Sequence, residues 1–219
     1  PHSKHEEQIV AAAKAGKHVF CEKPLALTLA SAQRSVDACE DAGVVLGVGH
    51  ERRFEPAMEN FFELIEQKEL GEIMHVEANF SHDKLANLEV DNWRVSSSES
   101  PAAAMTATGI HITDSYINMF GSVDQVFAMT ARRNPANFNG DILNFSVRFK
   151  SGVTGTFNSV LETPLYIRLA IFGTKAWVEA RDYCHPSEVG TTDVLIGRNQ
   201  NKIEKISYKN IDTVKANFE

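Results

Sequence analysis

The stretch "HVFCEKPLALT", residues 18–28, decides how the first part of the chain folds. It begins like a buried apolar strand and ends on the charged pair Glu22 and Lys23, followed by Pro24. Proline lacks a backbone N–H and biases the preceding residue toward an extended conformation, so strand pairing should stop here. A lysine at the carboxyl end of a strand can point into a crevice. The same residues also fit a solvated strand end with an ion pair, and these residues alone leave both interpretations open.

Helical patterns lie on both sides of this strand. Residues 5–15 place apolar side chains on one face and are followed by Gly16, a common helix stop. Residues 28–42 predict a second helix, with Thr28 as its N-cap and Gly43 as its stop. Its expected packing face consists of residues at helical spacing, namely Leu29, Ala32, Val36 and Cys39.

The next segment, "VVLGVGH" (residues 44–50), is a continuous apolar run like that of a parallel strand buried on both faces. The order helix, strand, helix, strand predicts the second half of a doubly wound, Rossmann-type parallel sheet. In such sheets ligands bind at the carboxyl ends of the strands, where Glu22, Lys23 and His50 are expected. "GVGH" lacks the third glycine and the following acidic strand of a dinucleotide fingerprint, so we assign it no phosphate-binding role.

From about residue 50 the pattern becomes that of an α+β fold. A helix is expected at about 56–69, and residues 73–82 alternate like an antiparallel strand with one wet face. A helix at about 104–119 follows, and then mostly strands. We therefore predict a second domain, residues 51–219, with a large, mostly antiparallel open sheet and helices on one face. Its later strands are expected near residues 143–149, 153–161, 165–172, 175–180, 192–197 and 203–208.

The helix "MTATGIHITDSYINMF" carries a histidine that could handle a proton. Its expected packing stripe is Ile110, Thr113 and Ile117, whereas Ala107, His111 and Asp114 share another face. A histidine of near-neutral pKa could take the proton of an alcohol while that alcohol is oxidised. A lone helical histidine is also a common structural residue, and the local pattern does not decide between the two roles.

Two short segments place polar side chains near the expected strand ends. "GHERRFEP" puts Arg52 and Arg53 just after a strand, where adjacent arginines form an ion-pair patch more often than an anion site. "DNWRV" suggests Trp93 as a pocket wall and Arg94 as a hydrogen-bond donor, although a packed loop tryptophan fits equally well.

The bulk composition excludes several function classes. A formal net charge of −7 disfavours a nucleic-acid or anionic-membrane partner, and no apolar run has the length of a membrane span. Three widely spaced cysteines fit a reduced, cytoplasmic setting. His75 and His82 differ in strand parity and should point to opposite faces, so we expect no metal site.

Several blocks of this chain resemble one protein family. "PHSKHEEQIVAAAKAGKHVFCEKPLALT" resembles the segment of the glucose–fructose oxidoreductase/inositol dehydrogenase (Gfo/Idh/MocA) family that ends in A-G-K-H-V-x-x-E-K-P. "GHERRFEPAMENFFELIEQKELGEI", "NWR…GIHITD" and "GTKAWVEA" are similar to its later blocks, so the resemblance covers essentially the whole chain. It implies an oxidoreductase that transfers a hydride between NAD or NADP and a sugar, polyol or related hydroxy compound.

The resemblance also implies roles for individual residues. Lys23 would bind the reacting hydroxyl and the nicotinamide ribose, with Glu22 and Pro24 setting its position on the cofactor side. His111 would be the acid–base residue. On the substrate side we expect Trp93, Arg94 and Thr108.

This chain departs from the family pattern beside the histidine. Many members have an aspartate four residues before it, which would orient the imidazole and favour its charged form, but this chain has Ala107. Thr106 or Thr108 could offer a hydroxyl instead. Ala102 and Ala103 replace the usual glycine pair before the helix. These departures motivate an alternative, a cofactor-binding regulatory or interaction protein whose catalytic site has decayed, and an NAD-dependent glycosidase of the same family is a third possibility.

The resemblance sets expectations for the whole molecule. Residues 1–50 would be the C-terminal part of a Rossmann domain, whose glycine-rich phosphate loop should precede Pro1, and the end at Glu219 carries no stop signal. We therefore expect this sequence to be part of a longer protein. An open sheet invites face-to-face packing, so a homo-oligomer, a dimer or tetramer through that face, is expected.

Overall fold

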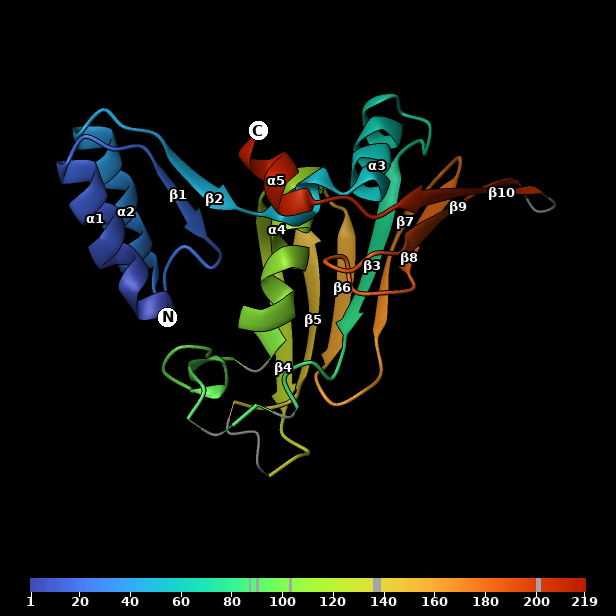
Figure 1. Ribbon diagram of the computed structural model, residues 1–219. Helices are drawn as coiled ribbons and strands as arrows, with labels where there is room; N and C mark the ends of the chain where they lie inside the picture. The colour runs from blue at the N-terminus through green and yellow to red at the C-terminus, as the bar shows by residue number, and fades with distance from the viewer. Residues whose placement is uncertain (87, 90, 103, 136–138, 200–201) are drawn as a thin grey trace.

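The computed structural model describes residues 1–86, 88–89, 91–102, 104–135, 139–199 and 202–219. Within these ranges the chain forms a two-stranded sheet from its first 50 residues and an eight-stranded sheet from the rest (Figure 1). No helix among them has the length and apolar character needed to cross a membrane.

The small unit consists of α1 (His5–Lys14), β1 (Val19–Glu22), α2 (Leu29–Asp41) and β2 (Leu46–Gly49). β1 and β2 pair in parallel, which confirms the expected arrangement. The Thr28 side chain accepts a hydrogen bond from the Ser31 backbone N–H at 3.2 Å and is the predicted N-cap. A small core of Ile9, Ala13, Cys21 and Cys39 holds the helices to the strands.

Two expectations for the small unit were wrong. Leu29 is 85% exposed, because the buried face of α2 is formed by Ser35 and Cys39. Val45 is 65% exposed, so the run 44–50 is not buried on both faces. The physical reason is that α1 and α2 lie on the same side of the small sheet, which leaves its other side partly open (Figure 1).

The large sheet has the strand order β10-β9-β8-β7-β3-β6-β5-β4. The predicted apolar face of β3 is confirmed for Val76, Ala78 and Phe80, which are buried, but Met74 at the start of the strand is 58% exposed. β3 was expected to be simply antiparallel, but it lies mid-sheet and pairs antiparallel with β7 and parallel with β6. The strands are β3 (Ile73–Ser81), β4 (Val123–Ala131), β5 (Ile142–Phe149), β6 (Thr154–Val160), β7 (Tyr166–Gly173), β8 (Trp177–Asp182), β9 (Thr191–Asn199) and β10 (Lys202–Lys209).

The helices α3 (Pro56–Glu66) and α4 (Ile110–Phe120) bury apolar side chains in one core with a single face of this sheet. The expected stripe of α4 was wrong. Ile112 and Tyr116 form the packing face, whereas Ile117 is 52% exposed. A π-helical turn, Met105–Gly109 (η4), precedes α4.

The C-terminal helix α5 (Thr213–Phe218) returns to the small unit (Figure 1). Its Phe218 ring meets Phe20 of β1 with centroids 5.4 Å apart, and the helix also contacts β2 and the 3₁₀ turn η2 (Glu51–Phe54). The chain end therefore helps to close the region where the two sheets meet.

Candidate active site

The carboxyl ends of β1 and β2 bring the first site residues together. Because Glu22 pairs with Gly49 across the parallel strands, the following residues Lys23 and His50 leave the sheet at the same edge. His5 of α1 is hydrogen-bonded through Nδ1 to the Pro24 carbonyl oxygen at 2.9 Å, and the Lys23–Pro24 peptide is cis. The predicted strand end is thus fixed by α1 as well as by proline.

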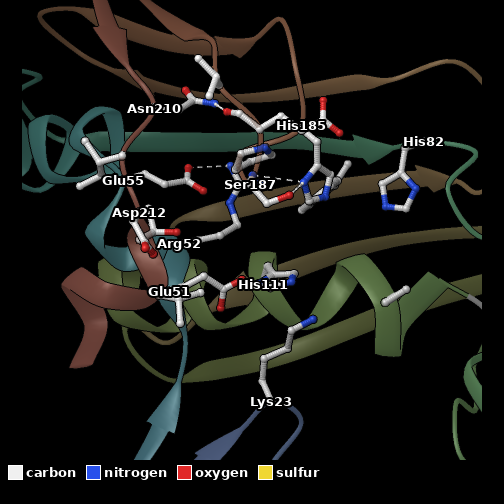
Figure 2. A pocket seen from close by; sticks show the side chains of 18 residues that line it. Lys23, Glu51, Arg52, Glu55, His82, His111, His185, Ser187, Asn210 and Asp212 are labelled. Carbon is white, nitrogen blue, oxygen red and sulfur yellow. Dashed lines mark hydrogen bonds and ion pairs between the residues drawn. The ribbon is translucent and has the colours of Figure 1, made fainter.

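A first cavity of ≈ 590 Å³ opens beside this edge, between the small unit and the large sheet. Figure 2 shows Lys23 reaching toward it from β1, with Glu51 and His111 on the neighbouring elements. Its principal polar side chains are Lys23, Glu51, Arg52, Glu55, His82, His111, His185, Ser187, Asn210 and Asp212.

A second cavity of ≈ 490 Å³ lies on the other side of Lys23. Its wall includes Glu22, Trp93 and Arg94, together with the N-terminal residues His2 and His5. The two cavities share Lys23, His82, Ala107 and His185. Lys23 therefore faces both spaces.

Burial makes Lys23 less basic than an exposed lysine. Desolvation lowers its pKa from the ordinary 10.5, the nearby carboxylates of Glu51 and Glu22 partly oppose this change, and Arg94 adds to it. A half-buried amine with nearby carboxylates is suited to binding a hydroxyl oxygen.

His111 is 7% exposed, and its pKa lies well below 6.5 because burial and the charges of Lys23 and Arg52 disfavour the cation. It is therefore neutral near pH 7. Its Nδ1 lies 3.8 Å from Glu51 Oε1, too far for a hydrogen bond, and has no hydrogen-bond partner among the described residues. A neutral imidazole has one nitrogen free to accept a proton.

The arginine pair confirms the ion-pair interpretation. Arg53 donates two hydrogen bonds to Asp114 at 2.8 and 2.6 Å, so this carboxylate is engaged away from His111. Arg52 is buried, donates to Glu55 at 3.0 Å and also reaches Asp182 at 3.4 Å.

Glu55 shares this buried cation with Asp182. Desolvation raises the pKa of Glu55 to about 7, although Arg52 pulls it down. Part of the lining of the first cavity, Arg52 and Glu55, therefore belongs to a buried ionic network.

Sequence reasoning missed Glu51, His82 and His185 as lining residues. His185 comes from the β8–β9 loop, and burial together with Lys84 lowers its pKa to about 4. Its ring lies 5.8 Å from the His82 ring. Glu51 is the second residue after β2, next to His50, and this position near a strand end was a signal in the sequence.

Other predicted residues are placed differently. Trp93 and Arg94 line the second cavity but not the first, so they share a wall with Glu22 rather than with His111. Pro24 lines neither cavity.

The expected substrate contact of Thr108 is not supported. It is fully buried, and its hydroxyl bonds the Ala104 carbonyl oxygen and Ser159 Oγ instead. Thr106 lines the second cavity, but its hydroxyl donates to the Pro101 carbonyl oxygen. Neither threonine replaces the carboxylate that is missing at Ala107, and Ala103 lies outside the described residues.

The predicted opposite orientation of the two β3-region histidines fits the structure. His75 is half-buried, with its Nδ1 2.7 Å from Thr154 Oγ1, whereas His82 lines both cavities. Within the described part of the chain, no three metal-ligating side chains cluster.

The second cavity has a donor set that fits part of a nicotinamide dinucleotide. It offers a lysine amine, an arginine guanidinium and a carboxylate for ribose hydroxyls and phosphate, and the flat Trp93 ring for stacking. Arg94 stacks over that ring, with its guanidinium carbon 4.3 Å from the ring centroid. Glu22, Lys23, Trp93 and Arg94 are thus the residues that could hold such a cofactor.

Two family models match the sequence. The model described as "GFO/IDH/MocA C-terminal domain" matches residues 59–179, and the one described as "Oxidoreductase family, NAD-binding Rossmann fold" matches residues 1–50.

Among curated proteins, a myo-inositol 2-dehydrogenase of Thermotoga maritima is 33% identical over 196 residues, covering 86% of this chain and 56% of the relative. A 1,5-anhydro-D-fructose reductase of Ensifer adhaerens is 29% identical over 191 residues, covering 85% and 56%. The chain spans about half the length of the curated relatives it matches.

Solved structures share the fold. An aldose-aldose oxidoreductase from Caulobacter crescentus superposes with a TM-score of 0.86 at 24% identity, covering 99% of this chain and 64% of that one. Levoglucosan dehydrogenase in complex with NADH gives a TM-score of 0.81 at 24% identity, with 95% and 59% covered.

Proposed function

This chain belongs to the GFO/IDH/MocA family, and on that premise we propose that it is part of an NAD- or NADP-dependent oxidoreductase acting on a sugar, polyol or related hydroxy compound. Residues 1–50 would be part of the cofactor domain and residues 51–219 the substrate domain. The observation that carries the proposal is that Lys23 and His111, from different elements, line one cavity.

The cofactor would lie on the side of the second cavity. Lys23 and Arg94 would donate hydrogen bonds to its ribose and phosphate oxygens, and Glu22 would accept from a ribose hydroxyl. When bound, the nicotinamide ring supplies the hydride exchange that the protein side chains lack.

In the first cavity the side chains would manage the proton of the substrate hydroxyl. Lys23 would hold the hydroxyl oxygen with an N–H and stabilise negative charge as it develops there. His111, neutral because it is buried, would accept the hydroxyl proton at one ring nitrogen during oxidation and return it during reduction.

The rest of the first cavity suits a polyhydroxy compound. Asn210, Ser187 and Asp212 offer donors and acceptors along one wall, while Phe80 contributes an apolar patch. A ring with several hydroxyls could satisfy these groups, which a simple aliphatic alcohol could not.

The proposal is tested with the encoded protein in full, assayed against a panel of polyols, aldoses and anhydrosugars with both NAD and NADP. Absorbance of reduced nicotinamide is the readout. We expect turnover of at least one polyhydroxy compound. Absence of turnover across the panel in both directions would refute an active oxidoreductase.

One observation favours a second candidate. Ala107 lines the cavity where many family members carry an aspartate, so the site could bind cofactor without turnover. Fluorescence of reduced nicotinamide separates the two functions. Saturable binding with no turnover would support a regulatory or interaction protein, whereas binding with turnover would exclude it.

We also propose that the protein is a cytoplasmic homo-oligomer. Its cysteines Cys21, Cys39 and Cys184 are free, as in a reducing compartment. On the edge strand β4, Phe127 and Met129 are 77% and 58% exposed on the face without helices, and a second copy could cover them. Light scattering should give at least a dimer, and Phe127→Asp should weaken it. A monomer at micromolar concentration would contradict the proposal.

A further inference from the structure

We infer that Glu51 is the positioning residue of His111, in place of the carboxylate that this chain lacks at Ala107. Its carboxylate would accept a hydrogen bond from His111 Nδ1–H, which fixes the tautomer and leaves Nε2 as the proton acceptor. The inference deepens the proposed function and rests on it for its meaning, but the contact itself can be measured without turnover.

The geometry places both groups at the same wall. Glu51 begins the short turn η2, with only His50 between it and the end of β2, and His111 lies at the start of α4, so elements far apart in sequence meet here (Figure 2). The gap from His111 Nδ1 to Glu51 Oε1 is 3.8 Å. A rotation of the glutamate side chain closes such a gap, and catalytic hydrogen bonds are often long before a ligand binds.

The burial of His111 Nδ1 favours a hydrogen bond to Glu51. His111 Nδ1 is buried without a hydrogen-bond partner among the described residues, which is unfavourable for a polar group. Glu51 is partly exposed, so its side chain has room to move. The hydrogen bond would satisfy the imidazole without displacing any other described pair.

The surrounding charges single out Glu51. The cationic or basic groups near His111 are Lys23 just after β1, His50 just after β2, Arg52 of η2 and His185 of the β8–β9 loop. Among nearby carboxylates, Asp114 is bound by Arg53 and Glu55 by Arg52. Glu51 has no ion pair in the described chain apart from His111.

Because residue 107 is an alanine, a carboxylate that positions His111 must come from another element. Its methyl group lines both cavities, one turn before His111, and cannot accept a hydrogen bond. A carboxylate at position 107 would approach from the π-helical turn η4 that precedes α4, whereas Glu51 approaches from η2. The two positions are therefore alternatives, which makes a rescue experiment possible.

The direct test is nitrogen NMR of the histidine rings in the 219-residue chain. In the wild type we expect the neutral His111 ring to carry its proton on Nδ1. Glu51→Ala should shift the ring toward the Nε2–H tautomer, and Glu51→Gln should lower the apparent pKa of His111 further, because a neighbouring negative charge is lost. Glu59→Gln, on the exposed side of α3, is the matched control and should change neither property.

Rescue separates a positioning role from a merely structural one. Ala107→Asp added to Glu51→Gln should bring the His111 pKa back up. In the encoded protein in full, Glu51→Gln should lower kcat at least tenfold with a smaller change in KM, and the double variant should recover part of it.

The outcomes are distinguishable. If the wild type shows no turnover, the proposed function fails while the ring measurement still decides the role of Glu51. If His111 keeps its tautomer and pKa in both Glu51 variants, the inference is overturned even in an active enzyme.

Discussion

At the scale of single residues, burial lowers the pKa values of the basic side chains Lys23 and His111 in the first cavity. Lys23 has a lowered pKa because it is desolvated, and His111 is neutral for the same reason. An amine near two carboxylates and an imidazole that lines the same cavity make a site where a hydroxyl proton can be transferred to a side chain.

His185 predicts how stability responds to acid. Its pKa is about 4 in the folded protein against 6.5 when exposed, mainly through desolvation. As the pH falls below 6.5, the unfolded chain binds the proton first, so the free energy of unfolding declines until about pH 4. His185→Gln should remove about 1–2 kcal/mol of the loss between pH 7 and pH 5, a range that allows for partial exposure.

Urea unfolding at several pH values measures this effect. Between pH 7 and pH 5 the free energy of unfolding of wild type should fall by about 1–2 kcal/mol more than that of His185→Gln, so the difference between the two proteins changes in favour of the variant as the pH falls. Parallel pH dependences would show that His185 titrates normally in the folded state.

Sequence analysis predicted Lys23 and His111, which line the first cavity, but not Glu51 or His185, which line it as well. Lys23 and His111 could be named because the family resemblance marked them. Glu51 was not predicted because no motif assigns it a role and it lies next to Arg52 and Arg53, although loops that follow parallel strands commonly carry site residues. His185 could not be predicted, because its loop carries no pattern and reaches the cavity only through the pairing of β8 with β9.

At the scale of elements, close packing of α4 on the sheet positions His111. Tyr116 of α4 donates a hydrogen bond to the Thr156 carbonyl oxygen at 2.7 Å and lies over Gly155 of β6. A side chain at Gly155 would meet Val76 Cγ1 at 2.8 Å and Val147 Cγ1 at 3.0 Å. These neighbours are stiff at χ1 and have little room to yield.

Gly155→Ala should therefore destabilise the protein by about 1–3 kcal/mol, the usual cost of overpacking a core. Chemical denaturation measures the change. Glu204→Gln, exposed on β10, is the control and should stay within about 0.5 kcal/mol of wild type. Equal free energies of unfolding for Gly155→Ala and wild type would contradict this prediction and would mean that α4 can shift away from the sheet without loss of stability.

The sequence predicted which segments form helices and strands, but not which strands pair or which helix face packs on the sheet. The alternation in residues 73–82 fixed the buried face of β3 but carried no information on its partners, so the parallel pairing with β6 was missed. The packing face of α4 was misjudged because Ile110 and Ile117 are as apolar as Ile112, so apolar character alone did not show that Ile112 and Tyr116 are buried and that Tyr116 packs next to Gly155.

At the scale of the whole molecule, two cores of unequal size share one site. The core of the large sheet includes Phe61, Tyr116 and Phe157 with many further buried side chains, whereas that of the small unit has only Ile9, Ala13, Cys21 and Cys39 fully buried. Lys23 belongs to the small unit and His111 to the large one, so the site depends on how firmly the two are held together.

Hydrogen exchange should reveal this inequality. Amides of β1 and β2 are expected to exchange through openings of lower free energy than those of β3 and β6, because less apolar surface is buried around them. Mass spectrometry of the exchanging 219-residue chain gives the comparison. Equal protection of both sheets would indicate that they unfold as one cooperative unit.

The central claim is that Lys23 binds the reacting hydroxyl beside the nicotinamide, and substitution of this side chain tests it most directly. Once a substrate is found, Lys23→Met in the encoded protein in full should lower kcat/KM at least 100-fold, the usual contribution of a group that handles the reacting proton. Lys14→Met, on the exposed face of α1, should leave the rate unchanged. A Lys23→Met rate within about threefold of wild type would contradict the account, because general acid–base groups contribute far more than that.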